Sequence, residues 1–390
     1  MTAARAAVTP AAAAVPEIVV APNCLRGYAS AAEVAGALVT GVRRARPGAH
    51  PVARPLADGG DGTLDALYAA RGGSRRPVEA VDVLGRTRTA QWLALDRDTA
   101  VVETAAVCGL GALRPAELRP LEAGSAGAGQ AVAAAVAAGA RTVLVALGGT
   151  AVVDGGAGAL AALGARFLDD RGREVEPCPA RLPEAVTVDL APARRLLAGV
   201  NVRLLADVRT PLSDNLQSFG AQKGVTAQNR PAAVRALRHF TGLLVGAGDH
   251  TAGERFLTPW FGAGGGIGFG LSAVAETTAE SGAEALLEIA DPDGHIGTAA
   301  LVVTAEGAID AGTWQGKLPG TVARLRRERG LPTGMVAVRA ARTGAGPDPL
   351  VTTHLVPGAP PDGPLTGPAL REGLARAAAD ACHAWAVRAA

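Results

Sequence analysis

The chain has 390 residues, of which 48% are hydrophobic and only 3% aromatic, and its formal net charge is +2. This length predicts two domains, and the apolar fraction is sufficient for sizeable cores built from Ala, Val and Leu. Because basic and acidic residues are balanced and interspersed, the composition gives no reason to expect nucleic acid or a membrane surface as a partner.

The N-terminal part of the chain predicts a leader followed by a strand and a helix. Residues 1–16 are rich in alanine and broken by prolines, which is typical of a disordered leader and not of a signal peptide. Residues 17–22 (EIVVAP) are predicted as the first strand. The next helix is expected to begin at Ser30, because Ser30 and Glu33 form a capping-box pattern ahead of apolar residues spaced four apart.

The following segment predicts a second strand and helix, and then a change of architecture. Residues 50–56 are a strand candidate, the loop ADGGDG spans 57–62, and a helix is expected over 64–70. Residues 76–103 contain short β-rich pieces instead of a further strand and helix. We therefore expect an inserted domain to begin near this point.

One arrangement recurs, an apolar strand that ends in a glycine-rich loop with a helix after it. The clearest copy covers 142–164, where 143–147 read as a buried strand and 148–158 as the loop. Related strand ends occur at 203–208 and 300–307. Alternation of this kind predicts parallel sheets with crossover helices.

We therefore predict an α/β protein of two domains. A Rossmann-like parallel-sheet domain is expected from both chain ends, residues 17–75 and 285–390, and a second α/β domain from the inserted residues 76–284. In such sheets ligands bind at the carboxyl ends of the strands, so the interface between the domains is the expected cleft. The residues predicted at those strand ends are Asn23, Asp58, Gly149, Asp207 and Glu306.

Two glycine-rich loops carry acidic residues. In GGTAVVDGG, residues 148–156, backbone N–H groups near a helix N-terminus would form a cradle for phosphate, and Asp154 is then expected beside a metal ion or a substrate hydroxyl. The alternative is an ordinary tight turn. In ADGGDG, Asp58 and Asp61 either belong to the site or form a solvated Asp-Gly turn.

Three further segments place acids or lysines after strands. TAEGAIDAGTWQGK brings Glu306, Asp310 and Lys317 into one segment, which suits a nucleotide–Mg²⁺ site, although a surface ion pair explains the same pattern. Asp207 in ADVRTPL either accepts a hydroxyl proton or caps a helix. Lys223 in FGAQKG is either a phosphate ligand or a solvated side chain.

Taken in order along the chain, these motifs resemble the bacterial type I glycerate kinase family. The matching blocks, between Ile18 and about Val338, are APNCLRG, PLADGGDGT, GGTAVVDGGAGALAALGARFLD, ADVRTPL, FGAQKG, GAGGGIGFGL and TAEGAIDAGTWQGK. The resemblance implies ATP-dependent, Mg²⁺-requiring phosphorylation of a hydroxyl of D-glycerate. It also implies two α/β domains around a cleft, one of them built from both ends of the chain.

The chain departs from the family pattern in polar groups that would orient the acceptor. The family typically has Asp, Ser and Lys where this chain has Asn23, Cys24 and Arg26. The other departures are Val153, Arg209, Thr210, Ala305, Ala308 and Gly312. The acids and the lysine expected to hold metal and phosphate are kept, so the pattern favours a kinase with an altered acceptor.

The resemblance and the motifs together assign a role in phosphoryl transfer to each candidate residue. Asp207, Asp58 and Lys317 are predicted to be catalytic, with Asp207 as the base that orients the acceptor hydroxyl. Predicted Mg²⁺ ligands are Asp154 and Glu306; predicted ATP contacts are Gly148, Gly149, Thr150, Gly155, Gly156, Lys223, Gly264 and Gly265; predicted contacts to the small acid are Asn23, Arg26, Arg209 and Asp310.

Two other functions stay open. An inactive homologue that binds a ligand as a regulator is compatible with the lost orienting groups. A dinucleotide-dependent oxidoreductase is disfavoured because no GxGxxG motif is followed by an acid some twenty residues later. The four cysteines are scattered without a CxxC pattern, which predicts reduced thiols in a cytoplasmic protein. The sequence leaves a homodimer open.

Overall fold

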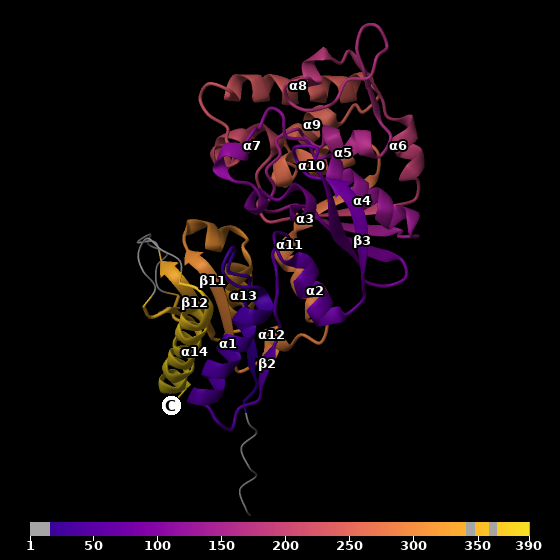
Figure 1. The fold of residues 1–390 in the computed structure, drawn as a ribbon. Helices are drawn as coiled ribbons and strands as arrows, with labels where there is room; N and C mark the ends of the chain where they lie inside the picture. The colour runs from indigo at the N-terminus through magenta and orange to yellow at the C-terminus, as the bar shows by residue number, and fades with distance from the viewer. Residues whose placement is uncertain (1–15, 341–347, 359–364, 390) are drawn as a thin grey trace, which may run out of the picture.

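The computed structural model describes residues 16–340, 348–358 and 365–389, so the predicted leader lies outside the described residues except for Pro16. The chain forms two α/β lobes, each organised around its own sheet (Figure 1). This arrangement confirms the predicted fold class. Among the residues that the structure describes, no helix combines the length and the apolar character that a membrane span needs.

The sheet of the first lobe is parallel throughout and is built from both ends of the chain. Its strand order is β13-β12-β11-β1-β2. β1 pairs in parallel with both β2 and β11, and Val19 lies opposite Val302. The two predicted strands at 17–22 and 300–307 are therefore neighbours. The strands are β1 (Ile18–Val20), β2 (Pro51–Ala53), β11 (Leu301–Ile309), β12 (Thr333–Ala340) and β13 (Val351–Leu355).

Helices cover both faces of this sheet. α1 (Ala31–Ala45) and α14 (Gly367–Ala389) pack against each other on one face, as Figure 1 shows at its lower end. α12 (His295–Thr298) and α13 (Leu318–Arg327) contribute to the core on the other face. α1 begins as predicted, because the Ser30 hydroxyl accepts from the Glu33 N–H and the Glu33 carboxylate accepts from the Ser30 N–H.

The second lobe contains a six-stranded sheet of order β10-β9-β6-β5-β4-β3. Four of its strands are parallel, whereas β3 and β4 add antiparallel pairings at one edge. The β-rich residues 76–103 supply β4, β5 and most of β3, of which β3 and β4 form this edge. The strands are β3 (Ser74–Val81), β4 (Thr87–Ala94), β5 (Thr99–Glu103), β6 (Thr142–Ala146), β9 (Asn201–Ala206) and β10 (Glu276–Ser281).

The remaining elements surround this second sheet and link the lobes. α2 (Thr63–Arg71) and α11 (Gly282–Ala290) share a core with residues of the six-stranded sheet, Leu144 and Leu205 among them. The boundaries predicted at 75/76 and 284/285 stay a prediction. The other helices are α3 (Ala105–Cys108), α4 (Ala126–Ala137), α5 (Ala157–Ala162), α6 (Ala191–Leu196), α7 (Leu212–Ser218), α8 (Arg230–Gly246), α9 (Ala252–Leu257) and α10 (Ile267–Leu271). A small sheet pairs β7 (Arg166–Leu168) with β8 (Thr187–Asp189), and short 3₁₀ helices are η1 (Leu110–Ala112), η2 (Pro115–Glu117), η3 (Leu182–Glu184), η4 (Ala221–Lys223), η5 (Ala263–Gly266) and η6 (Ala311–Gln315).

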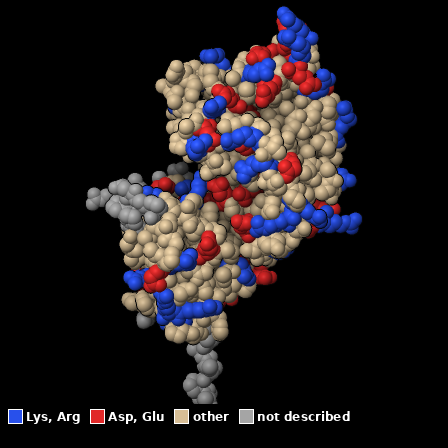
Figure 2. Space-filling model, viewed as in Figure 1, with Lys and Arg blue, Asp and Glu red and all other residues tan. Residues whose placement is uncertain are grey.

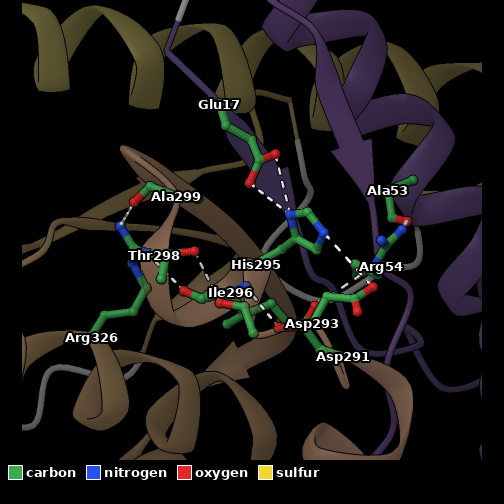
Figure 3. Close-up of polar contacts among 11 residues, drawn as sticks. Glu17, Ala53, Arg54, Asp291, Asp293, His295, Ile296, Thr298, Ala299 and Arg326 are labelled. Carbon is green, nitrogen blue, oxygen red and sulfur yellow. Dashed lines mark hydrogen bonds and ion pairs between the residues drawn. The ribbon is translucent and has the colours of Figure 1, made fainter.

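A polar network fastens the first lobe at the amino ends of β1 and β11 (Figure 3). His295 Nδ1 lies 3.0 Å from Glu17 Oε1, which joins α12 to the residue before β1. The fully buried Arg326 of α13 donates to the carbonyl oxygens of Ile296, Ala299 and Pro332 at 2.7, 2.8 and 2.9 Å. The guanidinium therefore stabilises the packing of α13 against the loops around it. Burial lowers the pKa of Arg326 to about 10.

We expect Arg326→Ala to lower the free energy of unfolding by about 3 kcal/mol or more, because buried carbonyl groups that lose their donors each cost about 1–3 kcal/mol. Urea unfolding compared with wild type measures the loss. Arg329→Ala, an exposed arginine just beyond the same helix, is the control. A loss no larger than that of the control would contradict the structural role of Arg326.

Candidate active site

The carboxyl ends of strands from both sheets face a common cleft between the lobes. A cavity of about 470 Å³ lies there. Figure 2 shows Asp and Glu side chains gathered in the hollow between the two lobes, with Lys and Arg around them. The predicted site residues that line this cavity are Asn23, Arg26, Asp58, Gly148, Gly149, Thr150, Asp207, Lys223, Gly264, Glu306, Asp310 and Lys317. Residues far apart in the sequence are thus brought together as the strand-end rule predicts.

The loop after β1 is fastened to the loop after β2 by side-chain contacts. Asn23 Nδ2 donates to Asp58 Oδ2 at 2.9 Å, and Arg26 Nε lies 2.6 Å from Asp61 Oδ2. The Cys24 thiol donates to the Asp61 carbonyl oxygen at 3.2 Å. Burial raises the pKa of Cys24 to about 12, so this thiol stays protonated. All three residues that depart from the family pattern in this loop therefore contact the ADGGDG segment.

Glycine is required where the loops of the two lobes meet. A Cβ on Gly148 would lie 2.6 Å from Gly60 Cα and 2.9 Å from Asp207 Oδ2. Gly149 has φ +77°, and a Cβ there would lie 2.9 Å from both carboxylate oxygens of Asp61. The Gly148 N–H donates to the Gly59 carbonyl oxygen at 2.8 Å. These glycines allow backbone and carboxylates to approach closely at the floor of the cleft.

Two carboxylates in the cleft are harder to ionise than ordinary aspartates. Burial, together with the charge of Asp58, raises the pKa of Asp207 to about 6. Burial also raises the pKa of Asp58, against the opposing influence of Arg26 and Lys317. Asp207 follows β9 directly, and Asp58 follows β2. Neither residue is the solvated turn or simple helix cap that the sequence left open.

Lys223 is buried in the wall of the cleft, with only 4% of its surface exposed. Its Nζ donates to the Val152 carbonyl oxygen at 2.9 Å and lies 3.4 Å from Thr150 Oγ1. Burial lowers the pKa of Lys223 to about 8, although Asp207 and Asp154 oppose the shift. The side chain therefore presents a fixed cation beside the GGTAVVDGG loop and is not solvated.

A second lysine is held by acids at the end of β11. Lys317 Nζ lies 3.1 Å from Glu306 Oε1 and 3.8 Å from Asp310 Oδ1. Thr313 Oγ1 donates to Glu306 Oε2 at 2.8 Å, so both oxygens of this carboxylate are engaged. Burial is the largest single influence and would lower the pKa of Lys317, but Glu306, Asp310 and Asp58 together outweigh burial, so the pKa is raised. Glu306 thus positions a lysine that stays charged.

Asp154 does not lie in the cleft, and its predicted role as a metal ligand is not supported. The residue is fully buried. Its Oδ2 accepts from the Ser125 N–H, the Ser125 hydroxyl and the Gly158 N–H at 2.8, 2.7 and 3.1 Å, and its Oδ1 accepts from the Gly156 N–H at 3.1 Å. A carboxylate with both oxygens occupied in the core holds the loop on the start of α4. We therefore replace the metal role with a structural one.

Four other predicted site residues do not line the first cavity. They are Gly155, Gly156 and Gly265, predicted to contact ATP, and Arg209, predicted to contact the small hydroxy acid. Gly155 N–H donates to the Gly265 carbonyl oxygen at 3.0 Å, and a Cβ on Gly156 would meet the Ile267 carbonyl oxygen at 2.7 Å. These glycines let two loops pack together instead of facing a ligand. Arg209 lines an adjoining cavity and not the cavity that Asn23 lines.

Two further acids lie near the site: Asp61, which the sequence left open between a site residue and a solvated turn, and Glu103, which the sequence did not single out. Asp61, in the ADGGDG motif, lines the cleft and pairs with Arg26. Glu103, at the end of β5, accepts from the N–H groups of Gly62 and Leu64 at 3.2 and 2.9 Å and thereby fixes the start of α2. Burial raises the pKa of Glu103 to about 7. Its position at the end of a parallel strand was the available signal.

Comparisons with known proteins identify relatives that match most of the chain. The sequence model described as the glycerate kinase family matches residues 18–353. The glycerate kinase of Bacillus subtilis (strain 168) is 32% identical over 331 residues, covering 84% of this chain and 86% of the relative. The glycerate 2-kinase of Escherichia coli (strain K12) is 35% identical over 317 residues, covering 80% and 82%.

A solved structure shows the same architecture. The crystal structure of a Salmonella typhimurium LT2 protein assigned as glycerate kinase 2 superposes with a TM-score of 0.78 at 30% identity, covering 96% of this chain and 98% of that one. The match spans both lobes and includes the cleft. The chain described here belongs to the glycerate kinase family.

Proposed function

We propose that this protein transfers a phosphoryl group from ATP to a hydroxyl of D-glycerate or a related hydroxy acid. The observation that carries the proposal is one cleft in which the half-buried carboxylates of Asp58 and Asp207 lie with Lys223 and Lys317. The relatives named glycerate kinase support the same activity. Phosphoryl transfer depends mainly on positioning and on charge stabilisation, and this cleft offers both.

Asp207 is the proposed base that accepts the acceptor hydroxyl's proton. A base works best when its pKa lies near the operating pH, and burial together with Asp58 brings the pKa of Asp207 to about 6. Gly148 lets the loop after β6 pack closely against this carboxylate, because a Cβ there would lie 2.9 Å from Asp207 Oδ2. Asp207 also lines the cavity, so a small hydroxylated molecule bound there has access to this carboxylate.

Lys223 and Lys317 are the proposed phosphate contacts. They approach the cleft from the two lobes, one from η4 and the other from the residue before α13. Each is held by neighbours that fix its Nζ, Val152 and Thr150 for Lys223 and Glu306 for Lys317. Cations held in this way stabilise charge on a transferring phosphoryl group without having to reorganise.

The cleft also suits a magnesium ion that arrives with the nucleotide. The described residues contain no group of three or more His, Cys, Asp or Glu side chains placed to hold a metal by themselves. Mg²⁺ is commonly bound by one or two carboxylates together with water and substrate phosphates. Asp58, with Glu306 as the second choice, fits that donor set, because burial raises the pKa of both side chains and a nearby cation would relieve that cost. When bound, Mg²⁺ supplies positive charge that offsets the charge of the phosphates.

Asn23, Cys24 and Arg26 are proposed to shape the acceptor end of the cleft. Arg26 is paired with Asp61, and Asn23 is bonded to Asp58. Arginine offers a planar fork where the family usually has the compact charge of a lysine, so the exchange alters how an acid is held. We therefore extend the proposed acceptors beyond D-glycerate to related hydroxy acids.

ADP release in the presence of ATP, Mg²⁺ and each member of a hydroxy-acid panel tests the proposal. The panel includes D-glycerate. We expect ADP release only when both Mg²⁺ and an acceptor are present. Nucleotide binding by calorimetry without ADP release for any acceptor would instead favour a ligand-binding regulator. Absence of both binding and turnover would overturn the proposed function.

We expect kcat/KM for the acceptor to fall as the pH drops through about 6, the value to which burial and Asp58 raise the pKa of Asp207. The sign follows from the chemistry, since only the ionised carboxylate accepts a proton and protonation below the pKa removes the base. Initial rates measured from well below to well above this pH give the profile. A rate that stays flat on the acid side would contradict the role of Asp207.

A further inference from the structure

A second, larger cavity of about 1410 Å³ adjoins the cleft. Asp207, Asp310 and Lys317 line both cavities, so the two adjoin beside the proposed base and a proposed phosphate contact. The first cavity, about 470 Å³, suits a small acid and phosphates, whereas the second has room for a much larger group. A nucleotide whose phosphates reach Lys317 would extend its nucleoside into this second cavity.

Aromatic side chains line the second cavity although they are rare in this protein. The chain has four tryptophans, and two of them, Trp260 and Trp314, face this cavity. Trp314 belongs to η6 in the first lobe and is 41% exposed, while Trp260 belongs to the second lobe. Exposure of so large an apolar ring beside a cavity is expected where a flat ligand stacks on it.

The position of Trp260 is fixed by its backbone and by its neighbours. It has φ +77°, and it is the only non-glycine residue with positive φ in the described part of the chain. The Gly262 N–H donates to the Thr210 carbonyl oxygen at 3.0 Å, which holds this turn on the loop after β9. The Arg209 guanidinium lies 5.2 Å from the centre of the Trp260 ring. A bulky residue held in this conformation points to a functional role.

We propose that the second cavity binds the nucleoside part of ATP, with its base stacked on Trp260 or Trp314 and with Arg209 on the nucleotide side. This inference rests on the proposed function and adds the site of the base. The sequence predicted that Arg209 contacts the acceptor acid, whereas this proposal assigns Arg209 to the nucleotide. Aromatic rings stack on any base, so the site would favour nucleotides over free polyphosphate without strong selection among bases.

Calorimetry separates the base from the phosphates. The probes are the Mg²⁺ complexes of a non-hydrolysable ATP analogue and of inorganic tripolyphosphate, titrated into the full chain. We expect wild type to bind the analogue more tightly than tripolyphosphate. At least one of the variants Trp260→Leu and Trp314→Leu should bind the analogue about 5- to 150-fold more weakly than the wild type. This factor equals the roughly 1–3 kcal/mol that stacking of one base contributes. Tripolyphosphate affinity should not change.

Trp385→Leu is a matched control. Trp385 also lies close to an arginine, with the Arg46 guanidinium 5.4 Å from its ring centre, but it belongs to α14 and lines neither cavity. If a leucine variant does not fold, the corresponding phenylalanine variant keeps a stacking ring and should retain most of the affinity. Tryptophan emission of the wild type supplies a readout without mutation, because the analogue should quench it more than tripolyphosphate does.

The outcomes are distinguishable. If the wild type binds the analogue and turns over ATP but neither tryptophan variant loses affinity, the base lies elsewhere and the inference is wrong while the proposed function stands. Equal wild-type affinity for the analogue and for tripolyphosphate, with no difference in quenching, also overturns the inference. If the wild type neither binds the analogue nor releases ADP, the proposed function itself fails.

Discussion

Asp207→Asn is expected to lower kcat by about 10²–10⁴-fold, the usual contribution of a positioned general base. The asparagine keeps the size of the side chain but cannot accept a proton as an anion. The close packing of this side chain against Gly148 should also be preserved, because it depends on the size of the side chain and not on its charge. Affinity for ATP, measured by calorimetry, should stay close to that of the wild type.

The comparison needs a variant with the same change of charge away from the cleft. Asp170→Asn, at an exposed position in the turn after β7, serves this purpose and should keep full turnover. An Asp207→Asn enzyme that retains most of its kcat would show that another group orients the acceptor. Asp58 would then be the next candidate, because it lies in the same cleft and its charge acts on Asp207.

We expect Asp154→Ala to lower the free energy of unfolding by about 3 kcal/mol or more, because buried donors left without a partner each cost about 1–3 kcal/mol. Three backbone N–H groups, those of Ser125, Gly156 and Gly158, would lose their acceptor in the core. The Ser125 hydroxyl would also lose its bond to Asp154. Urea unfolding monitored by circular dichroism measures the change, with Asp170→Ala as the exposed control.

The same variant separates the structural role of Asp154 from the metal role that the sequence indicated. If the residue holds the loop on α4, the fraction of protein that stays folded should need no more Mg²⁺ than wild type for half-maximal activity. An Asp154→Ala protein that unfolds at the wild-type urea concentration but needs much more Mg²⁺ would contradict the structural account. Asp154 would then be a Mg²⁺ ligand, as the sequence predicts.

The fold could be predicted because strand and helix periods, capping and glycine loops are local signals. EIVVAP and ALVVTAEG both read as strands that end in loops, and parallel-sheet topology brings such loops to one edge. Asp58 and Asp207 were found in this way, since Asp207 follows β9 directly and Asp58 lies in the loop after β2. Their presence in the cleft needed no knowledge of side-chain contacts.

The direction of a side chain within a glycine loop could not be predicted from local sequence. Asp154 comes eight residues after the end of β6, and its orientation is set by Ser125, which is 29 residues earlier in the chain. Lys223 illustrates the opposite case, because a lone lysine is usually solvated and only the packing of η4 against the loop at Val152 buries it. In both cases long-range contacts decide, and the motif does not contain them.

Phosphorus NMR of the wild-type protein incubated with ATP, Mg²⁺ and D-glycerate follows the transferred group itself. We predict a new phosphomonoester resonance that grows in step with ADP, and none in the Asp207→Asn sample over the same time. Inorganic phosphate as the only product, or unchanged ATP with D-glycerate and with every other hydroxy acid in the panel, would contradict phosphoryl transfer in this cleft.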